Sequence, residues 1–408
     1  MKSVALVAPF FQENTLRYVR ALAAVENCRP ILLTQDHPDR LPADLKGKIA
    51  AVQRVNNVMN GNDLAIGCRA LARTVGPVDG LFGVLEQLQI PLAEARDACA
   101  IPGMSAATAH NFRDKAKMKD VLRAAGVPVA RHALIEVDAD ALAFAELVGL
   151  PIILKPVDGL GSKGTFRVND DADMRRALKA LRPSMDTPIQ AEEFVVGSEQ
   201  TFETVTIDGK PVWHSGTYYM NRPLEVLENP WMQYCVLLPK EENLPEFAGF
   251  LPTNTQALTG LGMGTGLSHM EWFRRKDGSH VVSEVGARPP GVHIMPMMGL
   301  VNGVDFVDLW VRLMVHGTWP TGLKRKSAAG VCFFRGQGKG GRVASVEGLE
   351  KAQEIAGTWV VDRKLPKVGQ SRADTYEGEG WAIVQAPDTQ TCKEALRELV
   401  THVRVRYG

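Results

Sequence analysis

A turn signal at Asp277-Gly278 constrains this chain more than any other feature. Residues 269–291 read HMEWFRRKDGSHVVSEVGARPPG, so the Asp-Gly pair stands between two short apolar runs. In this setting an Asp-Gly pair is a strong signal for a β-hairpin. Such a hairpin brings two acidic residues, Glu271 and Glu284, close together on adjacent strands.

Two neighbouring carboxylates repel each other unless a cation or a proton lies between them. Magnesium usually takes one or two carboxylates plus substrate phosphates. Glu271 and Glu284 are therefore candidate ligands of magnesium, or of manganese in its place. Arg288 follows four residues after Glu284, where it could reach an anion held by that metal. The alternative is a solvated hairpin with a charged edge, and the rest of the chain decides between the two.

Length and composition describe an ordinary soluble protein of two or three domains. The chain has 408 residues, 45% of them hydrophobic and 23% charged. A net charge of +1 gives no reason to expect nucleic acid or a membrane as a partner. The six cysteines are scattered, without a CxxC pair or a cluster with histidine. This argues against a zinc site or a disulfide framework and predicts a cytoplasmic protein.

The N-terminal part alternates between strand and helix patterns, which predicts a parallel α/β sheet. Sheets of this kind bind ligands beyond the carboxyl ends of their strands. A further helix is expected at about 111–125, ending at Gly126. The expected strands are 3–8, 31–33 and 78–84, and the expected helices are 63–75 and 86–98.

A second unit begins near residue 130, and strands dominate its later part. Residues 327–408 follow as a small α+β appendage, in which the Gly-rich FFRGQGKGGR predicts a hairpin turn. No sequence repeat is present. The expected strands of the second unit are 132–136, 151–155, 165–168, 189–195, 199–207, 211–219 and the 269–285 hairpin, and the expected helices are 246–261 and 304–316.

The loop 158–164, DGLGSKG, is a candidate phosphate cradle, because glycines let successive backbone amides turn toward one anion. Lys155 precedes the loop at a strand end, and Lys115 opens a helix upstream. The loop fits neither a Walker A motif nor a dinucleotide fingerprint, and a plain hairpin turn is the alternative. Its candidate residues are Gly159, Gly161, Ser162 and Gly164.

Two further groups of residues are candidates for nucleotide binding. Exposed backbone at the end of strand 189–195 could hydrogen-bond a purine edge, and Glu199 could take ribose hydroxyls. Taken alone, the acidic residues here are better explained as surface charge.

All these pieces occur in one order that resembles the ATP-grasp superfamily over nearly the whole chain. The matching pieces are Asp114-Lys115, LKP at 154–156, DGLGSKG, EEFV followed by GSE, HMEWF and EVGARPPG. The resemblance implies an α/β and α+β protein: a Rossmann-like N-terminal domain followed by a two-lobed ATP-grasp fold with a small C-terminal appendage. The implied domains are 1–104, 105–320 with a small lobe at about 130–195, and 321–408, which completes the large lobe.

The resemblance also implies roles for the candidate residues. Lys115 and Lys155 resemble the lysines that bind nucleotide phosphates, and residues 159–164 the loop over the β- and γ-phosphates. Arg288 resembles the arginine that steadies the acyl phosphate and the tetrahedral intermediate. The remaining implied roles are an adenine hinge at Glu192, Glu193 and Val195, a ribose ligand at Glu199, and magnesium ligands at Glu271 and Glu284.

One position departs from the family pattern. ATP-grasp enzymes usually carry asparagine two residues after the second metal glutamate, and Gly286 stands there in this chain. One metal ligand, or its hydrogen bond to phosphate, is therefore missing or replaced. A water molecule or a bidentate Glu284 could compensate.

Three weaker candidates lie near the site. Glu86, at a strand-to-helix junction, could hold a substrate ammonium, although an acidic residue also suits the first turn of a helix. His293 could line the acceptor pocket, whereas a structural role is expected for His269. The polar and aromatic segment 220–235 could be a substrate lid.

Within the superfamily the chain resembles L-amino acid ligases, which implies an enzyme that uses ATP to join a carboxylate to an amine, releasing ADP and phosphate. Its implied partners are small-molecule carboxylates and amines, amino acids among them, and a homodimer is compatible with this interpretation. Two alternatives remain open. One is a carboxylase-like or purine-precursor ligase of the same fold, and the other is an ATP-binding subunit with impaired catalysis, which the glycine at 286 suggests.

Overall fold

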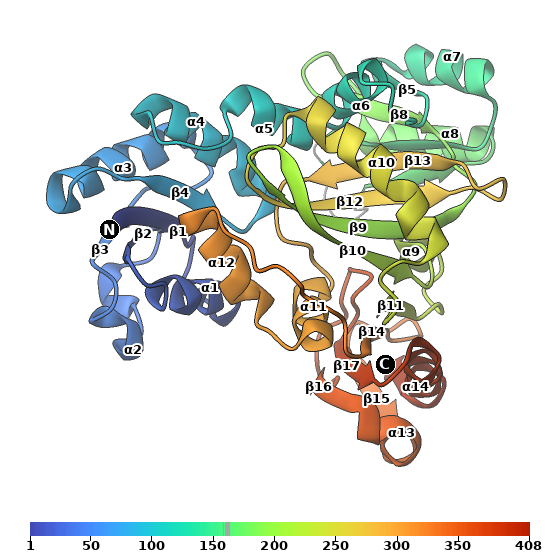
Figure 1. Ribbon diagram of the computed structural model, residues 1–408. Coiled ribbons are helices and arrows are strands. Elements are labelled where there is room, and N and C mark those ends of the chain that lie inside the picture. The colour runs from blue at the N-terminus through green and yellow to red at the C-terminus, as the bar shows by residue number, and fades with distance from the viewer. Residues whose placement is uncertain (158, 160–163) are drawn as a thin grey trace.

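The computed structural model describes residues 1–157, 159 and 164–408. Its N-terminal part is a four-stranded, fully parallel sheet in the order β3-β2-β1-β4 (Figure 1). The prediction of a parallel α/β unit is confirmed here, although strand β3 was not foreseen. The strands are β1 (Lys2–Val7), β2 (Cys28–Thr34), β3 (Ala51–Arg54) and β4 (Gly80–Gly83).

Helices cover both faces of this sheet because both faces of its strands are apolar. Val4 and Leu6 belong to one core cluster, whereas Ala5 and Val7 belong to another, as the two-residue period of a strand requires. Helices α3 (Gly61–Val75) and α4 (Gln89–Cys99) pack on the second cluster, and α1 (Glu13–Ala23) on the first. The short elements here are η1 (Pro38–Arg40), α2 (Ala43–Lys46) and η2 (Glu86–Leu88).

The helix predicted at 111–125 is confirmed from Lys115 to its end before Gly126, but its predicted start at 111 is wrong, because the chain breaks at Asp114. Two helices are present, α5 (Ala106–Arg113) and α6 (Lys115–Ala124). The Asp114 backbone is extended, and its carboxylate accepts hydrogen bonds from the amides of Ala116 and Lys117, both at 3.0 Å. This is an N-cap, which places Lys115 in the first turn of α6.

A smaller antiparallel sheet follows, in the order β5-β8-β6-β7. The segment predicted as a glycine-rich loop connects β6 to β7, and Gly161 and Ser162 lie outside the described residues. Two helices, α7 (Asp138–Val148) and α8 (Asp171–Leu181), pack on its core. The strands are β5 (His132–Ile135), β6 (Ile152–Pro156), β7 (Phe166–Val168) and β8 (Ile189–Glu193).

The largest sheet has eight antiparallel strands in the order β13-β12-β9-β10-β11-β14-β17-β16. Strands from both sides of residue 320 share this sheet, and the division at 104 and 320 remains a prediction. The strands are β9 (Ser198–Ile207), β10 (Lys210–Tyr219), β11 (Tyr234–Leu238), β12 (Gly266–Arg274), β13 (His280–Gly286), β14 (Ala328–Phe334), β16 (Val360–Lys364) and β17 (Gly380–Ala386).

Around this sheet lie α9 (Pro223–Glu228), α10 (Pro245–Leu261), α11 (Ile294–Asn302), α12 (Phe306–His316), α13 (Leu349–Ala356), η3 (Gly357–Trp359) and α14 (Thr389–His402). The helix predicted at 304–316 is α12, and it joins the core that also contains α1. In the described part of the chain, no single helix is long and apolar enough to span a membrane. Helices α11 and α12 meet those criteria only as a pair, bent by 98°.

The hairpin predicted at FFRGQGKGGR is wrong. Strand β14 before it pairs with β11 and β17, whereas β15 (Val343–Glu347) after it pairs with β18 (Arg404–Tyr407). The Gly-rich segment therefore connects two different sheets.

Candidate active site

The hairpin predicted from Asp277-Gly278 is confirmed. Strands β12 and β13 pair in a register that sets Glu271 directly opposite Glu284. Gly278 takes a positive φ of 84°, which glycine adopts without steric cost. The Asp277 carboxylate accepts hydrogen bonds from the amide and the hydroxyl of Ser279, at 2.9 and 2.7 Å. The strand register shifts by one residue between Glu271 and Trp272, so the turn and this bulge together set the two acidic residues opposite each other.

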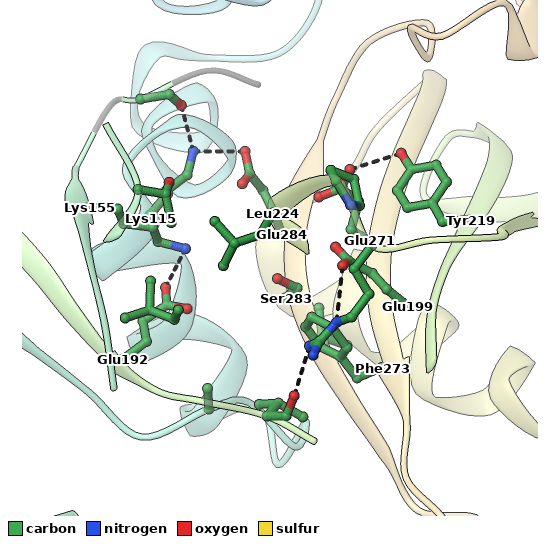
Figure 2. A pocket seen from close by; sticks show the side chains of 18 of the residues that line it. Lys115, Lys155, Glu192, Glu199, Tyr219, Leu224, Glu271, Phe273, Ser283 and Glu284 are labelled. Carbon is green, nitrogen blue, oxygen red and sulfur yellow. Dashed lines mark hydrogen bonds and ion pairs between the residues drawn. The ribbon is translucent and has the colours of Figure 1, made fainter. Parts of the chain in front are cut away.

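Both glutamates face a cleft between the small and the large sheets (Figure 2). The cleft encloses about 1390 Å³, counted out to its open mouth. Its walls are formed by residues of the small sheet, of the large sheet and of the N-terminal unit that contains the parallel sheet. The predicted site residues that line it are Glu86, Lys115, Lys155, Gly159, Glu192, Glu193, Val195, Glu199, Glu271, Glu284 and Arg288.

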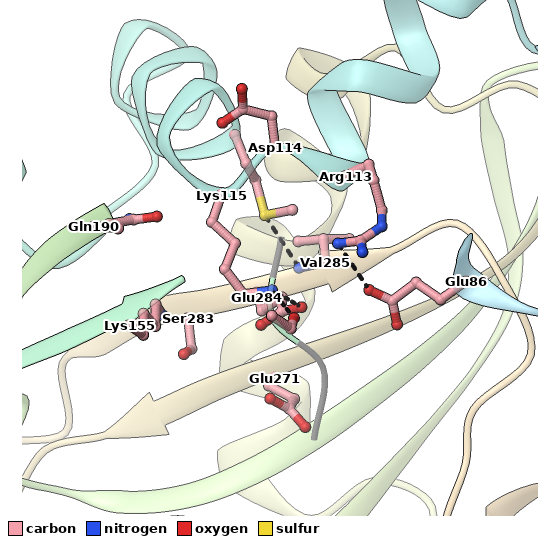
Figure 3. Close-up of polar contacts among 12 residues, drawn as sticks. Glu86, Arg113, Asp114, Lys115, Lys155, Gln190, Glu271, Ser283, Glu284 and Val285 are labelled. Carbon is pink, nitrogen blue, oxygen red and sulfur yellow. Dashed lines mark hydrogen bonds and ion pairs between the residues drawn. The ribbon is translucent and has the colours of Figure 1, made fainter. Parts of the chain in front are cut away.

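Lys115 contacts both the loop residue Gly159, a predicted phosphate-binding residue, and Glu284, a predicted metal ligand. Its Nζ lies 2.8 Å from Glu284 Oε1 and donates to the Gly159 carbonyl at 3.0 Å (Figure 3). Burial would raise the pKa of Glu284, but Lys115 and Lys155 outweigh it and lower that pKa to about 2. Glu284 is therefore a carboxylate at any physiological pH, as a magnesium ligand must be.

Lys119 is a second lysine of α6 that lines the cleft, and it was not predicted from the sequence. Lys119 and Lys155 both pair with Glu192 Oε1, at 3.4 and 2.7 Å, and Lys119 also donates to the Ser283 carbonyl at 3.1 Å. Burial lowers the pKa of Lys119, whereas Glu192 and Glu284 together overcome burial and raise the pKa of Lys155. The only signal in the sequence was the four-residue spacing from Lys115, which puts both lysines on one helix face.

The three residues predicted for the adenine hinge each contact lysine or arginine side chains. The Glu192 side chain contacts the two lysines. Glu193 pairs with Arg131 at 2.5 Å, and with Arg275 at 3.7 Å. The Val195 carbonyl accepts a hydrogen bond from Arg222 at 2.8 Å.

Arg222, which the sequence analysis also missed, reaches the predicted ribose ligand. Its Nε lies 3.7 Å from Glu199 Oε2. Burial and the nearby Glu271 carboxylate raise the pKa of Glu199 to about 8. Arg222 also stacks over the rings of Phe194 and Phe273, so it ties the start of α9 to the cleft wall. The predicted lid 220–235 thus contributes lining residues at its start.

Glu271 is held by two neighbours that were not foreseen as partners. The Tyr219 hydroxyl donates to Glu271 Oε1 at 3.0 Å, and His269 Nε2 lies 3.7 Å from the same oxygen. Burial alone would lower the pKa of His269, but its contacts with Glu203 and Glu271 outweigh burial and raise that pKa to about 9.

Arg288 meets Glu86 across the substrate end of the cleft. Its Nε and Nη2 donate to Glu86 Oε2 at 2.8 and 2.7 Å, and its Nη1 donates to the Pro289 carbonyl at 2.9 Å. Arg113 Nη1 lies 3.7 Å from the other oxygen of Glu86 (Figure 3). The glutamate predicted to hold a substrate ammonium is therefore already engaged by guanidinium groups.

Two predicted residues stand outside the cleft lining. Gly164 lies at the end of the loop, with a φ of 71° and Pro156 beside it. His293 packs its ring on Trp381, with centroids 4.2 Å apart, and on Phe333. Positive φ values at Val292 and His293 redirect the chain after Arg288, so nearness in sequence to the site does not place His293 in it.

The donor set fits magnesium brought by a nucleotide. Among the described residues, no three His, Cys, Asp or Glu side chains gather into a metal site of their own. Glu271 and Glu284 instead offer two carboxylates to a shared cleft. Two carboxylates plus phosphates and water is the set that magnesium commonly takes. Lys115, Lys119 and Lys155 line the same cleft and bring positive charge beside these carboxylates, which suits a ligand that carries phosphates.

Gly286 lies beside the Arg288 side chain. A Cβ built on Gly286 would lie 3.4 Å from Arg288 Cγ and 3.5 Å from its Nε, which are ordinary contacts. We expect Gly286→Ala to keep both turnover and ATP affinity. Gly286→Asn should keep ATP affinity but lower kcat, because a side chain longer than a Cβ would crowd Arg288, the nearest neighbour of that Cβ. ADP release and calorimetric ATP binding are the measurements, and a collapse of ATP affinity in either variant would contradict this account.

Comparison with known proteins identifies the domain around this cleft. Residues 114–197 match the family model of the carbamoyl-phosphate synthase L chain, ATP binding domain. The carbamoyl phosphate synthase large chain of Methanothermobacter thermautotrophicus is 25% identical over 230 residues, 56% of this chain but only 21% of that protein. A D-alanine–D-alanine ligase of Neisseria gonorrhoeae is 25% identical over 246 residues, 59% of this chain and 76% of the relative.

Solved structures share the fold over the full length. The L-amino acid ligase from Bacillus licheniformis superposes with a TM-score of 0.79 at 20% identity, covering 100% of this chain and 99% of that one. A carboxyaminoimidazole ribonucleotide synthase from Aspergillus clavatus, complexed with ATP, gives 0.70 at 18% identity, with 98% of each chain covered. The matched ATP-binding domain, the ligase relatives and this shared fold together show that the chain is similar to ligases of the ATP-grasp type.

Proposed function

We propose that this enzyme is a carboxylate–amine ligase that joins amino acids through an acyl phosphate and releases ADP and phosphate. The observation that carries the proposal is the pairing of Glu271 with Glu284 in a cleft that also holds Lys115, Lys155 and Arg288. Phosphoryl transfer of this kind depends on positioning and on neutralising charge rather than on a covalent enzyme nucleophile.

In this proposal one end of the cleft binds the nucleotide. Lys115 and Lys155 contact its phosphates, with Gly159 and the rest of the loop 159–164 above them. Glu192 orients Lys155 rather than meeting adenine with its side chain, since it lies 2.7 Å from that lysine. The backbone of Glu193 and Val195 faces the base, and Glu199 faces the ribose.

Magnesium bound by Glu271 and Glu284 would offset the negative charge of the β- and γ-phosphates. Lys115 has a double task, because it now pairs with Glu284 at 2.8 Å. With a nucleotide bound, Lys115 would hold a phosphate oxygen in place of this carboxylate, which would leave Glu284 to hold the metal.

Arg288 serves the carboxylate substrate at the other end. A carboxylate oxygen attacks the γ-phosphorus, and the bond to ADP breaks. The amine then attacks the carbonyl carbon, loses a proton, and the bond to phosphate breaks. Arg288 binds the negative charge that develops on these oxygens, and Glu86 holds the guanidinium in place. A substrate ammonium at Glu86 remains a proposal, which requires that the Glu86–Arg288 contact loosen.

A phosphate-release screen over pairs of amino acids and small acids tests this function. We expect phosphate only when a carboxylate and an amine are both present, together with a product whose mass equals their sum less water. ATP turnover with bicarbonate alone would instead support a carboxylase-like enzyme of the same fold. ATP binding without ADP release in any mixture would support an impaired ATP-binding subunit.

A further inference from the structure

A buried acidic residue lies behind the cleft, and the proposed mechanism does not use it. Glu203, on β9, is fully buried and stands directly opposite His269 on β12. Its Oε1 lies 2.9 Å from His269 Nδ1, and the Thr217 hydroxyl donates to its Oε2 at 3.3 Å. A buried carboxylate is costly unless it is paired and hydrogen-bonded, so these contacts are what makes Glu203 tolerable there.

Glu203 thereby fixes the orientation of the His269 ring. With Nδ1 engaged by Glu203, the other ring nitrogen is directed at the cleft, where Nε2 lies 3.7 Å from Glu271 Oε1. The imidazole thus bridges a fully buried carboxylate and a carboxylate of the cleft wall. All of these groups stand on neighbouring strands of one sheet, which is a rigid support.

Two groups converge on the same oxygen of Glu271. Tyr219, on β10, donates its hydroxyl to Oε1 at 3.0 Å, and Nε2 of His269, two residues before Glu271 on β12, lies 3.7 Å from the same oxygen. Within the described residues, Oε2 of Glu271 has no hydrogen-bond or ion-pair partner. The carboxylate is therefore anchored through one oxygen and leaves the other for a ligand.

We propose that Glu203, His269 and Tyr219 are positioning residues that make Glu271 a one-oxygen metal ligand, through Oε2. This inference rests on the proposed function, in which Glu271 binds the metal. Groups that orient a metal-binding carboxylate typically change metal affinity by about 10–100-fold when they are removed. His269 acts on the metal only through Glu271.

The test measures direct binding of manganese ions to the full chain saturated with a non-hydrolysable ATP analogue. The electron paramagnetic resonance signal of the manganese that stays free in solution reports the binding. His269→Ala should weaken manganese binding by about tenfold or more, and Glu203→Gln and Tyr219→Phe should weaken it in the same direction. Affinity for the analogue in EDTA should not change. His214→Ala is the matched control, because His214 is on β10 of the same sheet and stacks on Phe202 instead.

A double mutant separates positioning from a general structural role. In the Glu271→Gln background, adding His269→Ala should cause no further loss of manganese affinity, because the group it positions is already gone. An equal loss in both backgrounds, or no loss from His269→Ala in the native background, overturns the inference. Should His269→Ala not fold, Tyr219→Phe provides the same comparison in the same two backgrounds.

The native protein distinguishes this inference from the proposed function. Absence of manganese binding by native protein with the analogue would overturn both. Normal binding by the native protein that His269→Ala and Tyr219→Phe leave unchanged would overturn the positioning role alone.

Discussion

Glu284→Gln is expected to reduce ADP release to background while the protein stays folded. Burial would raise the pKa of Glu284, but Lys115 and Lys155 lower it to about 2, so this carboxylate is fully charged at neutral pH. Glutamine keeps its shape but removes the charge that opposes magnesium. Glu271→Gln should act in the same direction but less strongly, since Glu284 then remains. ADP release in a coupled assay is the measurement.

A measurement of ATP binding by Glu284→Gln distinguishes loss of the metal ligand from damage to the whole nucleotide site. Because Glu284→Gln frees Lys115 from its 2.8 Å ion pair, metal-free binding of ATP should be kept or tightened. Glu398→Gln is the matched control: its carboxylate is exposed to 29%, against 27% for Glu284, and pairs with His402 on α14. That variant should keep native turnover. Native ADP release by Glu284→Gln would show that the metal assignment is wrong.

Arg288→Ala is the second large effect, and we expect it on kcat rather than on ATP affinity. The residue is assigned to charge that develops on the reacting carboxylate, and removal of such a contact typically costs about 10²–10³ in kcat. Arg288→Lys should rescue poorly. The guanidinium uses Nε and Nη2 toward Glu86 and Nη1 toward a carbonyl, a planar arrangement that an ammonium cannot reproduce.

The Arg288 variants are judged by ADP release alongside calorimetric ATP binding. The thermal unfolding of these variants should be measured as well. Arg288, just after β13, contacts Glu86 in the N-terminal unit, so its loss could also change stability. Glu86→Gln is a useful companion: it keeps the guanidinium in the cleft but loosens it, so its loss of kcat should be smaller. If ATP affinity falls as much as kcat in Arg288→Ala, Arg288 is a nucleotide ligand instead.

Local signals in the sequence were sufficient for the hairpin and for much of the fold. The Asp-Gly turn and the alternating residues around it predict the hairpin itself, because both depend only on neighbours in the chain. The register shift that sets Glu271 opposite Glu284 had no such local signal. The alternation of strands and helices likewise predicted the parallel sheet. The break at Asp114 had a signal too, since aspartate is a preferred N-cap, but the apolar pattern runs through it.

What the sequence could not supply are contacts between distant segments. Lys119 gains its role only because Glu192 comes to it from another strand, and His269 only because Glu203 stands opposite. The Gly-rich segment after β14 resembles a turn, yet strand partners are chosen by the whole sheet rather than by the segment between them. His293 is near Arg288 in sequence, but the positive φ values beside it send its ring to Trp381.

Transfer of heavy oxygen from the carboxylate substrate to phosphate tests the central claim most directly. The measurement uses an amino acid that supports phosphate release in the screen, labelled with heavy oxygen in its carboxyl group. An acyl phosphate requires that each released phosphate carry one labelled oxygen, which mass spectrometry detects. Labelled phosphate formed by the native enzyme, and none by Glu284→Gln, is the predicted result. Phosphate without label would contradict activation of the carboxylate, and with it the ligase mechanism proposed for this cleft.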